Sequence, residues 1–288
     1  MSQNGALTQL VAVGAQEKNF ISNEEKDSLF KEPKKKINNF VKSSQSIYPI
    51  GKSNWDTTTR FKIEKKGDLL GSIYLSVTIP TLNNNPYLDY PDDVDASGNN
   101  SNYVRWVNYI GNALIKRVKL YFDGQLIDEQ TGEFMQVYTD IQDDDWNKLC
   151  LIGMNTGLNK PLTYVEEDYL YIPLKFWFCE GGEKALPLIS MQYTDIEIEV
   201  EFRKFDECYQ VLKLKKEPLG EAGMDAYNYE HSDFVHTDIK FKKEFLSNLS
   251  LKSVCLDCNF YYVDMEERER LSKKEHKILI TQTQSIIT

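Results

Sequence analysis

Apolar and polar residues alternate in several short segments of the chain from about residue 40 onward. Successive side chains of a β-strand point to opposite faces, so a period of two indicates strands with one buried face. The alternation predicts strands over residues 73–79, 118–122, 126–128, 170–178 and 195–202. Asp123-Gly124 separates the second segment from the third, and this residue pair favours the tight turn of a hairpin.

Helical spacing occurs in fewer places. One set of apolar residues predicts a short amphipathic helix over residues 133–142, because it recurs at the interval of a single helix face: Phe134, Val137, Tyr138 and Ile141. Residues 264–274 are dense in Glu, Arg and Lys and are expected to form a second helix. Residues 83–102 are rich in Asn, Asp, Pro and Gly, and we expect them to form a long surface loop.

The order of these segments indicates the fold class. Strands predominate, the helices are short and lie in connections, and no βαβ rhythm or internal repeat is visible. Tyr (17) and Phe (14) are abundant and 41% of the 288 residues are apolar, which is ample for a packed core. The sequence therefore predicts an all-β protein built as an antiparallel sandwich, of which the jelly roll is a common version.

The formal net charge of −10 argues against one class of function. A protein that wraps a nucleic-acid backbone needs a basic face to displace counterions, so no direct nucleic-acid contact is expected. No apolar run approaches the roughly 18 residues needed to cross a bilayer, and the first residues lack the basic-then-apolar order of a signal peptide. We therefore expect a soluble protein that is not secreted. The five cysteines are scattered, which suits a reducing compartment without disulfides.

Cys255 and Cys258 have the spacing used by zinc sites and by redox-active dithiols. A zinc site needs further ligands, and Cys208 and His231 lie in irregular sequence without forming a second pair. One strand face is predicted from Val254, Leu256, Cys258 and Phe260, which places Cys255 on the opposite face. Opposite faces disfavour a shared metal, so we expect no metal site here.

Three other segments match ligand-binding motifs only in part. Residues 93–98 begin like a calcium loop, but Val104 stands where the bidentate glutamate belongs. Gly51-Lys52-Ser53 is similar to the end of a phosphate-binding loop, although Ser46 occupies the first glycine position. The adjacent carboxylates at residues 143–145 are typical of a solvated loop next to a helix.

The residues that usually perform catalysis are sparse. The three histidines are His231, His236 and His276, and neither a Ser nor a Cys stands in a recognisable nucleophile motif. The sequence therefore predicts no catalytic and no cofactor-binding residues, and a protein that is not an enzyme. The lysine run at residues 34–36 fits a solvated segment or a contact with an anionic surface, and both interpretations stay open.

Several segments resemble, in the same order, the N-terminal portion of the major capsid proteins of nucleocytoplasmic large DNA viruses. The most specific is YIPLKFWF at residues 171–178, followed by ALPLISMQY at 185–193. The remaining segments are GALTQLVAVGAQ at 5–16, DLL at 68–70 with YLSVTIP at 74–80, VRWVNYIG at 104–111, and YYVD at 261–264. Together they span nearly the whole chain.

This resemblance implies a double jelly roll with a structural role. In the family, three copies close into a trimer with six similar rolls, a nearly hexagonal block that tiles the facets of an icosahedral capsid. The expected partners are other copies of the chain and neighbouring capsomers, together with minor capsid proteins or an internal membrane contacted by the N-terminal arm. The expected location is the capsid of a virion that is assembled in the host cytoplasm.

The resemblance also implies a division of the chain into an N-terminal arm (1–39), a first jelly roll with long surface loops (40–205), an inter-roll connection (206–246) and the start of a second roll (247–288). The end departs from the family pattern, since about forty residues follow Leu249, too few for a second roll of eight strands. A fragment, a split gene product and a shortened paralogue all fit. Because a roll that is only begun leaves unpaired strand edges, the isolated chain is expected to associate irregularly.

Two rival functions remain open. A glycan-binding jelly roll would use aromatic and polar residues on exposed loops, and the sequence offers Tyr87, Tyr90, Asp92 and Asn102. A thiol or zinc enzyme would rest on Cys255 and Cys258 alone. A capsomer protein is distinguished by its size as a trimer and by its presence in virions.

Overall fold

The computed structural model describes residues 40–84, 88–89, 102–142, 146–153, 157–214, 234–273 and 275–284. Several segments considered above lie outside the described residues: the arm at 1–39 with its lysine run, the calcium-like segment at 93–98, the carboxylates at 143–145, and His231.

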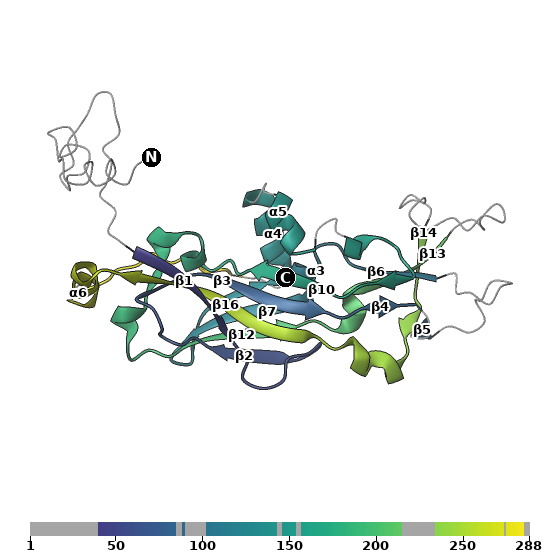
Figure 1. Ribbon diagram of the computed structural model, residues 1–288, viewed down its shortest axis with the longest axis horizontal. Helices are drawn as coiled ribbons and strands as arrows, with labels where there is room; N and C mark the ends of the chain where they lie inside the picture. The colour runs from purple at the N-terminus through teal and green to yellow at the C-terminus, as the bar shows by residue number, and fades with distance from the viewer. Residues whose placement is uncertain are drawn as a thin grey trace, which may run out of the picture.

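Two antiparallel sheets form the body of the protein (Figure 1). The first sheet contains, in spatial order, β1 (Phe40–Ile47), β16 (Lys252–Val263), β3 (Leu69–Ile79) and β10 (Asp168–Pro173), with the short β11 (Leu186–Pro187) paired to β3. The second sheet contains β2 (Thr58–Lys62), β12 (Ile196–Phe202), β7 (Ile115–Phe122) and β8 (Gln125–Thr131). Along the chain these strands alternate between the sheets, as in a jelly roll, except at the β7–β8 hairpin and at β10 and β11, which both lie in the first sheet. The predicted fold class is confirmed.

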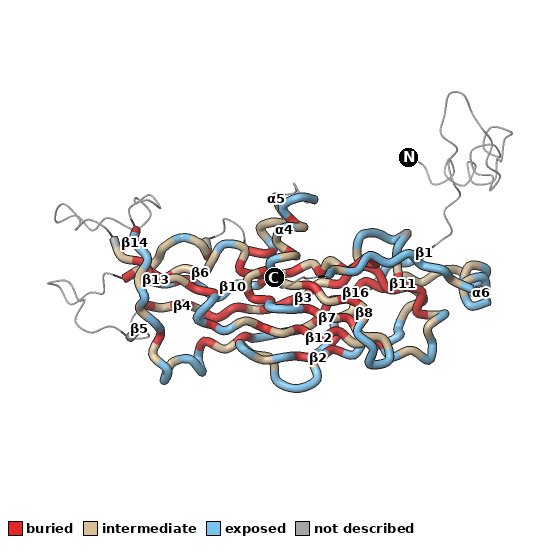
Figure 2. Tube along the Cα trace, turned by 180° about the vertical axis from the view of Figure 1, so that it is seen from behind, coloured by how far each residue is buried: buried red, intermediate tan, exposed pale blue. Residues whose placement is uncertain are grey.

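One hydrophobic core lies between the two sheets. The alternation predicted over residues 73–79 and 195–202 is confirmed, because the apolar positions of β3 and β12 are buried. Leu75, Leu120, Ile198 and Phe260, which come from both sheets, are all 0% exposed and belong to the same cluster. Figure 2 shows the buried residues gathered along the strands of the sandwich.

The strand β16 lies in the interior of the first sheet, although the sequence had placed it at the start of a second roll. Ser46 of β1 is in register with Asp257, and Ser76 of β3 with Cys255, so β16 has a partner on each side. The expected boundaries at 205 and 247 therefore do not match the pairing. Between β12 and β16 the described part of the chain contains the short strands β13 (Tyr209–Leu214), β14 (Phe234–Thr237) and β15 (Lys240–Phe241).

The strand expected over residues 170–178 is shorter than the alternation indicated. β10 ends at Pro173, which has no backbone N–H for the ladder, and one further bond joins Leu174 N to Ile73 O. The chain then enters a 3-10 helix at Trp177–Cys179. Trp177 and Phe178 are both buried, so the period of two stops there because the backbone is no longer extended.

Both predicted helices are present, and one is turned differently from the expectation. They are α4 (Gly132–Gln142) and α6 (Met265–Lys273). The buried residues of α4 include Met135 and Thr139, whereas Val137 is 57% and Ile141 is 77% exposed. The apolar face predicted for this helix therefore points partly to solvent.

Short elements complete the described part of the chain. The remaining α-helices are α3 (Ile110–Leu114) and α5 (Trp146–Leu151). The 3-10 helices lie at Gly157–Asn159, Trp177–Cys179, Gly182–Lys184, Leu188–Met191, Phe205–Glu207 and Lys243–Leu249.

Three long connections run from β3 to β7, from β8 to β10 and from β12 to β16. Parts of all three meet at one end of the sandwich, opposite the end that holds α6 (Figure 1). They pair with one another in small sheets made of β4 (Leu82–Asn83), β5 (Leu88–Asp89), β6 (Asn102–Trp106), β9 (Tyr164–Val165), β13 (Tyr209–Leu214), β14 (Phe234–Thr237) and β15 (Lys240–Phe241). Trp55 stacks on Trp106 with ring centroids 5.8 Å apart, and Phe205 packs edge-on against both. This aromatic cluster attaches the small sheets to the sandwich.

Candidate assembly surface

The outer face of the first sheet carries mostly hydroxyl and aromatic groups and few charges. Its outward side chains alternate with the core positions of β1, β16, β3 and β10 and include Phe40, Lys42, Ser44, Ser46, Lys252, Cys255, Asp257, Asn259, Tyr261, Ser72, Tyr74, Ser76, Thr78, Tyr169 and Tyr171. In this set the charged side chains are Lys42, towards one end of β1, Asp257, in the middle of β16, and Lys252, which forms an ion pair with Glu167 over 2.7 Å. Tyrosine and serine dominate the rest.

Asp257 is the centre of a hydrogen-bond network on this face. The hydroxyls of Ser46 and Ser76 each donate to one of its carboxylate oxygens, so the charge is shared between the strands on both sides. Asp257 is 9% exposed and Ser76 is 0% exposed. Burial, followed by the nearby charge of Asp257, raises the pKa of the Tyr171 phenol well above its ordinary value of 10. The face is therefore polar yet well packed.

Aromatic rings cover much of the same face. The rings of Tyr74 and Tyr171 stack with centroids 4.7 Å apart, and Tyr169 lies 6.3 Å from Tyr171. The ring of Tyr261 lies over Gly71, where an added Cβ would come within 2.5 Å of a ring carbon. Gly71 is needed for this close approach, because any larger residue would clash with the ring.

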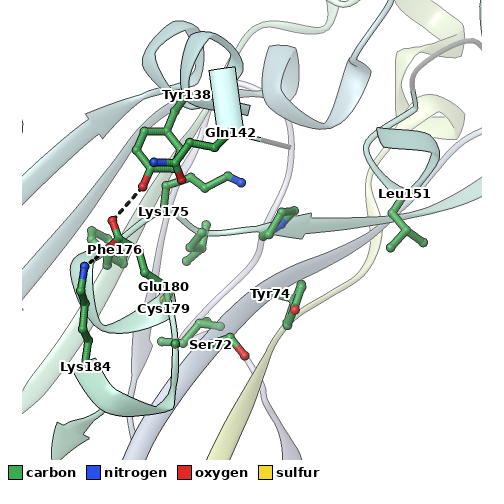
Figure 3. Close-up of a pocket in the computed structure, with 14 residues that line it drawn as sticks. Ser72, Tyr74, Tyr138, Gln142, Leu151, Lys175, Phe176, Cys179, Glu180 and Lys184 are labelled. Carbon is green, nitrogen blue, oxygen red and sulfur yellow. Dashed lines mark hydrogen bonds and ion pairs between the residues drawn. The ribbon is translucent and has the colours of Figure 1, made fainter. Parts of the chain in front are cut away.

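A groove of about 600 Å³ continues this face beneath α4 (Figure 3). Ser72 and Tyr74 of β3 line one side, and Tyr138 and Gln142 of α4 line the other. The Tyr138 hydroxyl donates to Glu180 Oε1 over 2.7 Å. Lys184 also binds Glu180, and the pKa of that carboxyl is lowered first by this lysine and then by Tyr138.

The rest of the groove lining is mixed in character. Lys175 Nζ lies 5.5 Å from the ring centroid of Tyr138, close enough for a cation–π contact. Leu151 of α5 also lines the groove and is 45% exposed. An apolar or aromatic side chain of another molecule fits such a lining better than a charged ligand does, because Lys175, Glu180 and Lys184 already have partners.

The outer face of the second sheet is a ladder of ion pairs. Glu199 of β12 binds Arg60 of β2 over 2.8 Å and Lys119 of β7 over 3.4 Å. The ladder continues in three further cross-strand pairs: Lys62–Asp195, Arg117–Glu129 and Lys116–Glu201. Lys116 lowers the pKa of the Glu201 carboxyl through a direct hydrogen bond. Water solvates most of these side chains, so the face is suited to remain exposed.

The two cysteines of the CxxC segment lie on opposite faces of β16, as the alternation predicted. Cys258 is 0% exposed in the core, while Cys255 lies on the outer side and is half-buried. Burial raises the pKa of both thiols, so the reactive thiolate is disfavoured. All five cysteines are free. Within the described ranges no group of three or more His, Cys, Asp or Glu side chains is placed to hold a metal.

The remaining sequence candidates do not come together. Gly51 lies between β1 and β2, and the segment after it enters a strand, not the helix that a phosphate loop requires. Of the residues considered for glycan binding, Asn102 is 0% exposed and its carbonyl accepts a bond from Asn84, which argues against the exposed loop position proposed for it. Tyr87, Tyr90 and Asp92 lie outside the described residues. Among the helices that the structure describes, none is long and apolar enough to span a bilayer.

The small number of charges on the outer face of the first sheet was not predicted, although the alternation contains the signal. The polar positions of β3 are Ser72, Tyr74, Ser76 and Thr78, whereas those of β12 are Asp195, Glu197, Glu199 and Glu201. The alternation predicts one buried face for both segments and does not by itself distinguish their outer faces. The two segments differ in chemistry, since β3 has Ser, Tyr and Thr where β12 has Asp and Glu, and a face without carboxylates loses less solvation energy when another molecule covers it.

Comparison with known proteins gives consistent relatives. Capsid protein 1 of Acanthamoeba polyphaga mimivirus is 28% identical over 293 residues, covering 97% of this chain and 43% of the relative. Probable capsid protein 4 of the same virus is 29% identical over 238 residues, covering 82% of this chain and 44% of the relative. The major capsid protein of Phaeocystis pouchetii virus is 24% identical over 306 residues, covering 97% and 52%. The chain thus spans about half the length of these curated relatives.

Solved structures support the fold. The Faustovirus major capsid protein superposes with a TM-score of 0.61 at 14% identity, covering 85% of this chain and 58% of that one. The PBCV-1 VP54 crystal structure, fitted into a reconstruction of the virophage Sputnik, gives a TM-score of 0.60 at 18% identity, covering 88% and 49%. The family model described as "Major capsid protein N-terminus" matches residues 28–238, well over half of the chain. The chain belongs to this family of major capsid proteins.

Proposed function

We propose that the chain is a structural building block of the icosahedral capsid of a large double-stranded DNA virus. The observation that carries this proposal is the jelly roll whose three long connections all gather at one end of the sandwich. A roll of this shape can stand upright in a shell with its connections on one surface, so lateral contacts remain available on its sides. Membership of the capsid family supports the same role.

We infer a finer assembly from the same features. Three copies would close into a trimeric, nearly hexagonal capsomer, which repeats through lateral contacts over flat facets. Buried area between copies would supply the stabilising free energy without any reactive group. The rival enzyme function has little support, because the thiols of Cys255 and Cys258 are held on opposite faces with raised pKa values.

We also propose a revised division of the chain. Residues 40–263 would form the first roll, with β16 as its last strand, and a second roll would begin only after Val263. The pairing of β16 with both β1 and β3 supports this boundary. The arm at residues 1–39 would contact minor capsid proteins or an internal membrane, and assembly would take place in the host cytoplasm. The net charge of −10 argues against a direct contact with DNA.

Mass spectrometry of purified virions tests the proposed function. Peptides of this chain should co-purify with intact particles and survive protease treatment that removes loosely bound proteins. A second measurement is the native mass of the protein released gently from particles, which should correspond to three copies. Virions that contain no peptide of this chain would contradict the proposal, and a monomeric mass would contradict the trimer alone.

A further inference from the structure

We propose that the outer face of the first sheet, with the groove beneath α4, is the surface on which a second copy of this chain docks. The proposal rests on the proposed function, since it names the partner and the face for the lateral contacts of a shell. The docking face comprises the outward side chains of β1, β16, β3 and β10 defined above, together with the groove lining.

The charge of the chain favours this face for contact between identical copies. Two molecules that each carry a formal charge of −10 repel one another, and the repulsion is smallest where the approaching surfaces have no net negative charge. Asp257 is screened on the docking face by the hydroxyls of Ser46 and Ser76, and Lys42 adds a positive charge. Close approach over this face therefore has a low Coulomb cost.

Desolvation favours the same face. Covering the second sheet would remove water from an extended ladder of charged side chains, and that loss commonly exceeds the gain from their mutual attraction. The docking face instead presents tyrosines, a residue type enriched in protein interfaces while Lys, Glu and Asp are depleted. Tyr169 is 50% exposed and adds apolar area that becomes buried on contact.

Exposed apolar groups lie at two borders of the docking face. Phe40 at the β1 edge is 55% exposed, and its ring meets that of Tyr261 at 5.8 Å. Leu151 lies in the groove at the opposite border and is 45% exposed. An approaching copy that covers the tyrosines between these residues buries the exposed parts of both.

The size of the face fits a lateral contact within an assembly. Four strands about 4.8 Å apart, with eight residues each rising about 3.3 Å, give a flat area of about 500 Å². A stable two-protein interface needs about 800 Å² per partner. The sheet alone is therefore too small for a permanent dimer, and the groove and α4 are needed to complete it. A contact of this strength becomes stable when it is repeated around a closed ring or across a lattice.

Charge insertion on each sheet tests the proposal in the full-length chain. Ser44→Glu and Tyr169→Glu place a carboxylate on exposed positions of the docking face. Thr58→Glu on the second sheet and Tyr193→Glu, at a position that is 97% exposed, are the matched controls. Self-association is followed by sedimentation equilibrium over a range of concentrations, and thermal melts confirm that each variant is folded.

We expect each variant of the docking face to weaken self-association at least tenfold, while both controls stay within twofold of the wild type. Equal weakening by Thr58→Glu and Ser44→Glu, or no effect of either docking-face variant, would overturn the proposal. A wild-type chain that remains monomeric at every concentration would also overturn it. The proposed function is tested separately by the virion measurement, so it can survive a failure of the docking face.

Discussion

The outer faces of the two sheets belong to one sandwich and share one core, yet they differ in chemistry. The second sheet carries the Arg60–Glu199–Lys119 ladder, in which a buried glutamate is paired with a cation on each neighbouring strand. The first sheet carries stacked tyrosines and a buried carboxylate, Asp257, satisfied by serine hydroxyls. The second sheet adds further, partly exposed ion pairs around its ladder, whereas the first sheet has hydroxyl and aromatic groups around its carboxylate. This difference is the reason why we propose the first sheet, and not the second, as the docking face.

The comparison also explains why polar side chains need not make a strand face solvated. Ser76 points away from the core and is still 0% exposed, because Asp257 and the neighbouring rings enclose it. Asn259 is similarly held, with its amide donating to Ser72 Oγ over 2.7 Å. Such groups have already lost most of their water, so covering them further costs less than covering a solvated ion pair.

The largest expected effect concerns the core that both faces share. Trp177 is 4% exposed and packs edge-on against Phe122 of the second sheet and against Phe178. Trp177→Ala should lower the free energy of unfolding by about 3 to 5 kcal/mol, because it leaves a cavity between the sheets. Urea denaturation measures this loss, with Tyr193→Ala as an exposed control that should change little. A loss no larger than that of the control would show that the sheets do not depend on this contact.

A smaller effect separates the two faces directly. Asp257→Ala should cost about 1 to 3 kcal/mol, because the buried hydroxyl of Ser76 is left without its partner. Glu201→Ala on the second sheet should cost about 1 kcal/mol or less, because the pair with Lys116 is partly exposed. Equal losses in urea denaturation would contradict the distinction, and Asp257→Asn should be intermediate because it keeps one acceptor oxygen.

The smallest expected effects concern the pH dependence of stability, one at acid pH and one at alkaline pH. The lowered pKa of Glu201 contributes stability that is present above the ordinary glutamate pKa and is lost as the pH falls below it. The raised pKa of Tyr171 acts at the other end, because an unfolded tyrosine ionises above pH 10 while the folded one resists ionisation, so stability is lost as the pH rises.

Thermal melts between pH 3 and pH 11 measure both limbs. Glu201→Gln should flatten the acid limb and leave the alkaline limb unchanged, while Tyr171→Phe should do the reverse. If either variant merely shifts the whole curve by a constant amount, the pH dependence does not come from the residue assigned to it.

Much of the sandwich was predictable from alternation, because the strands of residues 73–79 and 195–202 each bury one parity of side chains. The position of β16 in the first sheet was not predictable. Its residue Asp257 pairs with Ser46, which is 211 residues away in the sequence, and no local pattern indicates so distant a pairing. The same limit applies to α4, where helical spacing predicted the element and tertiary packing decided that Met135 would be buried and Ile141 exposed.

The outer faces were predictable in composition and not in role. Alternation shows which face of a strand is apolar. Whether the polar face is solvated depends on the hydrogen bonds that its side chains make with neighbouring strands. In the sequence Asp257 cannot be distinguished from a solvated strand residue, because its partners Ser46 and Ser76 lie on other strands of the sheet.

Oxidative footprinting of tyrosines in isolated chains and in assembled particles reports directly which of the two sheets is covered by another copy. Tyr169 on the first sheet is 50% exposed, and Tyr121 on the second sheet is partly exposed, so both can be labelled before assembly. If the first sheet is the docking face, labelling of Tyr169 falls severalfold in particles while labelling of Tyr121 stays the same. Unchanged labelling of Tyr169, or protection of Tyr121 in its place, would contradict this prediction.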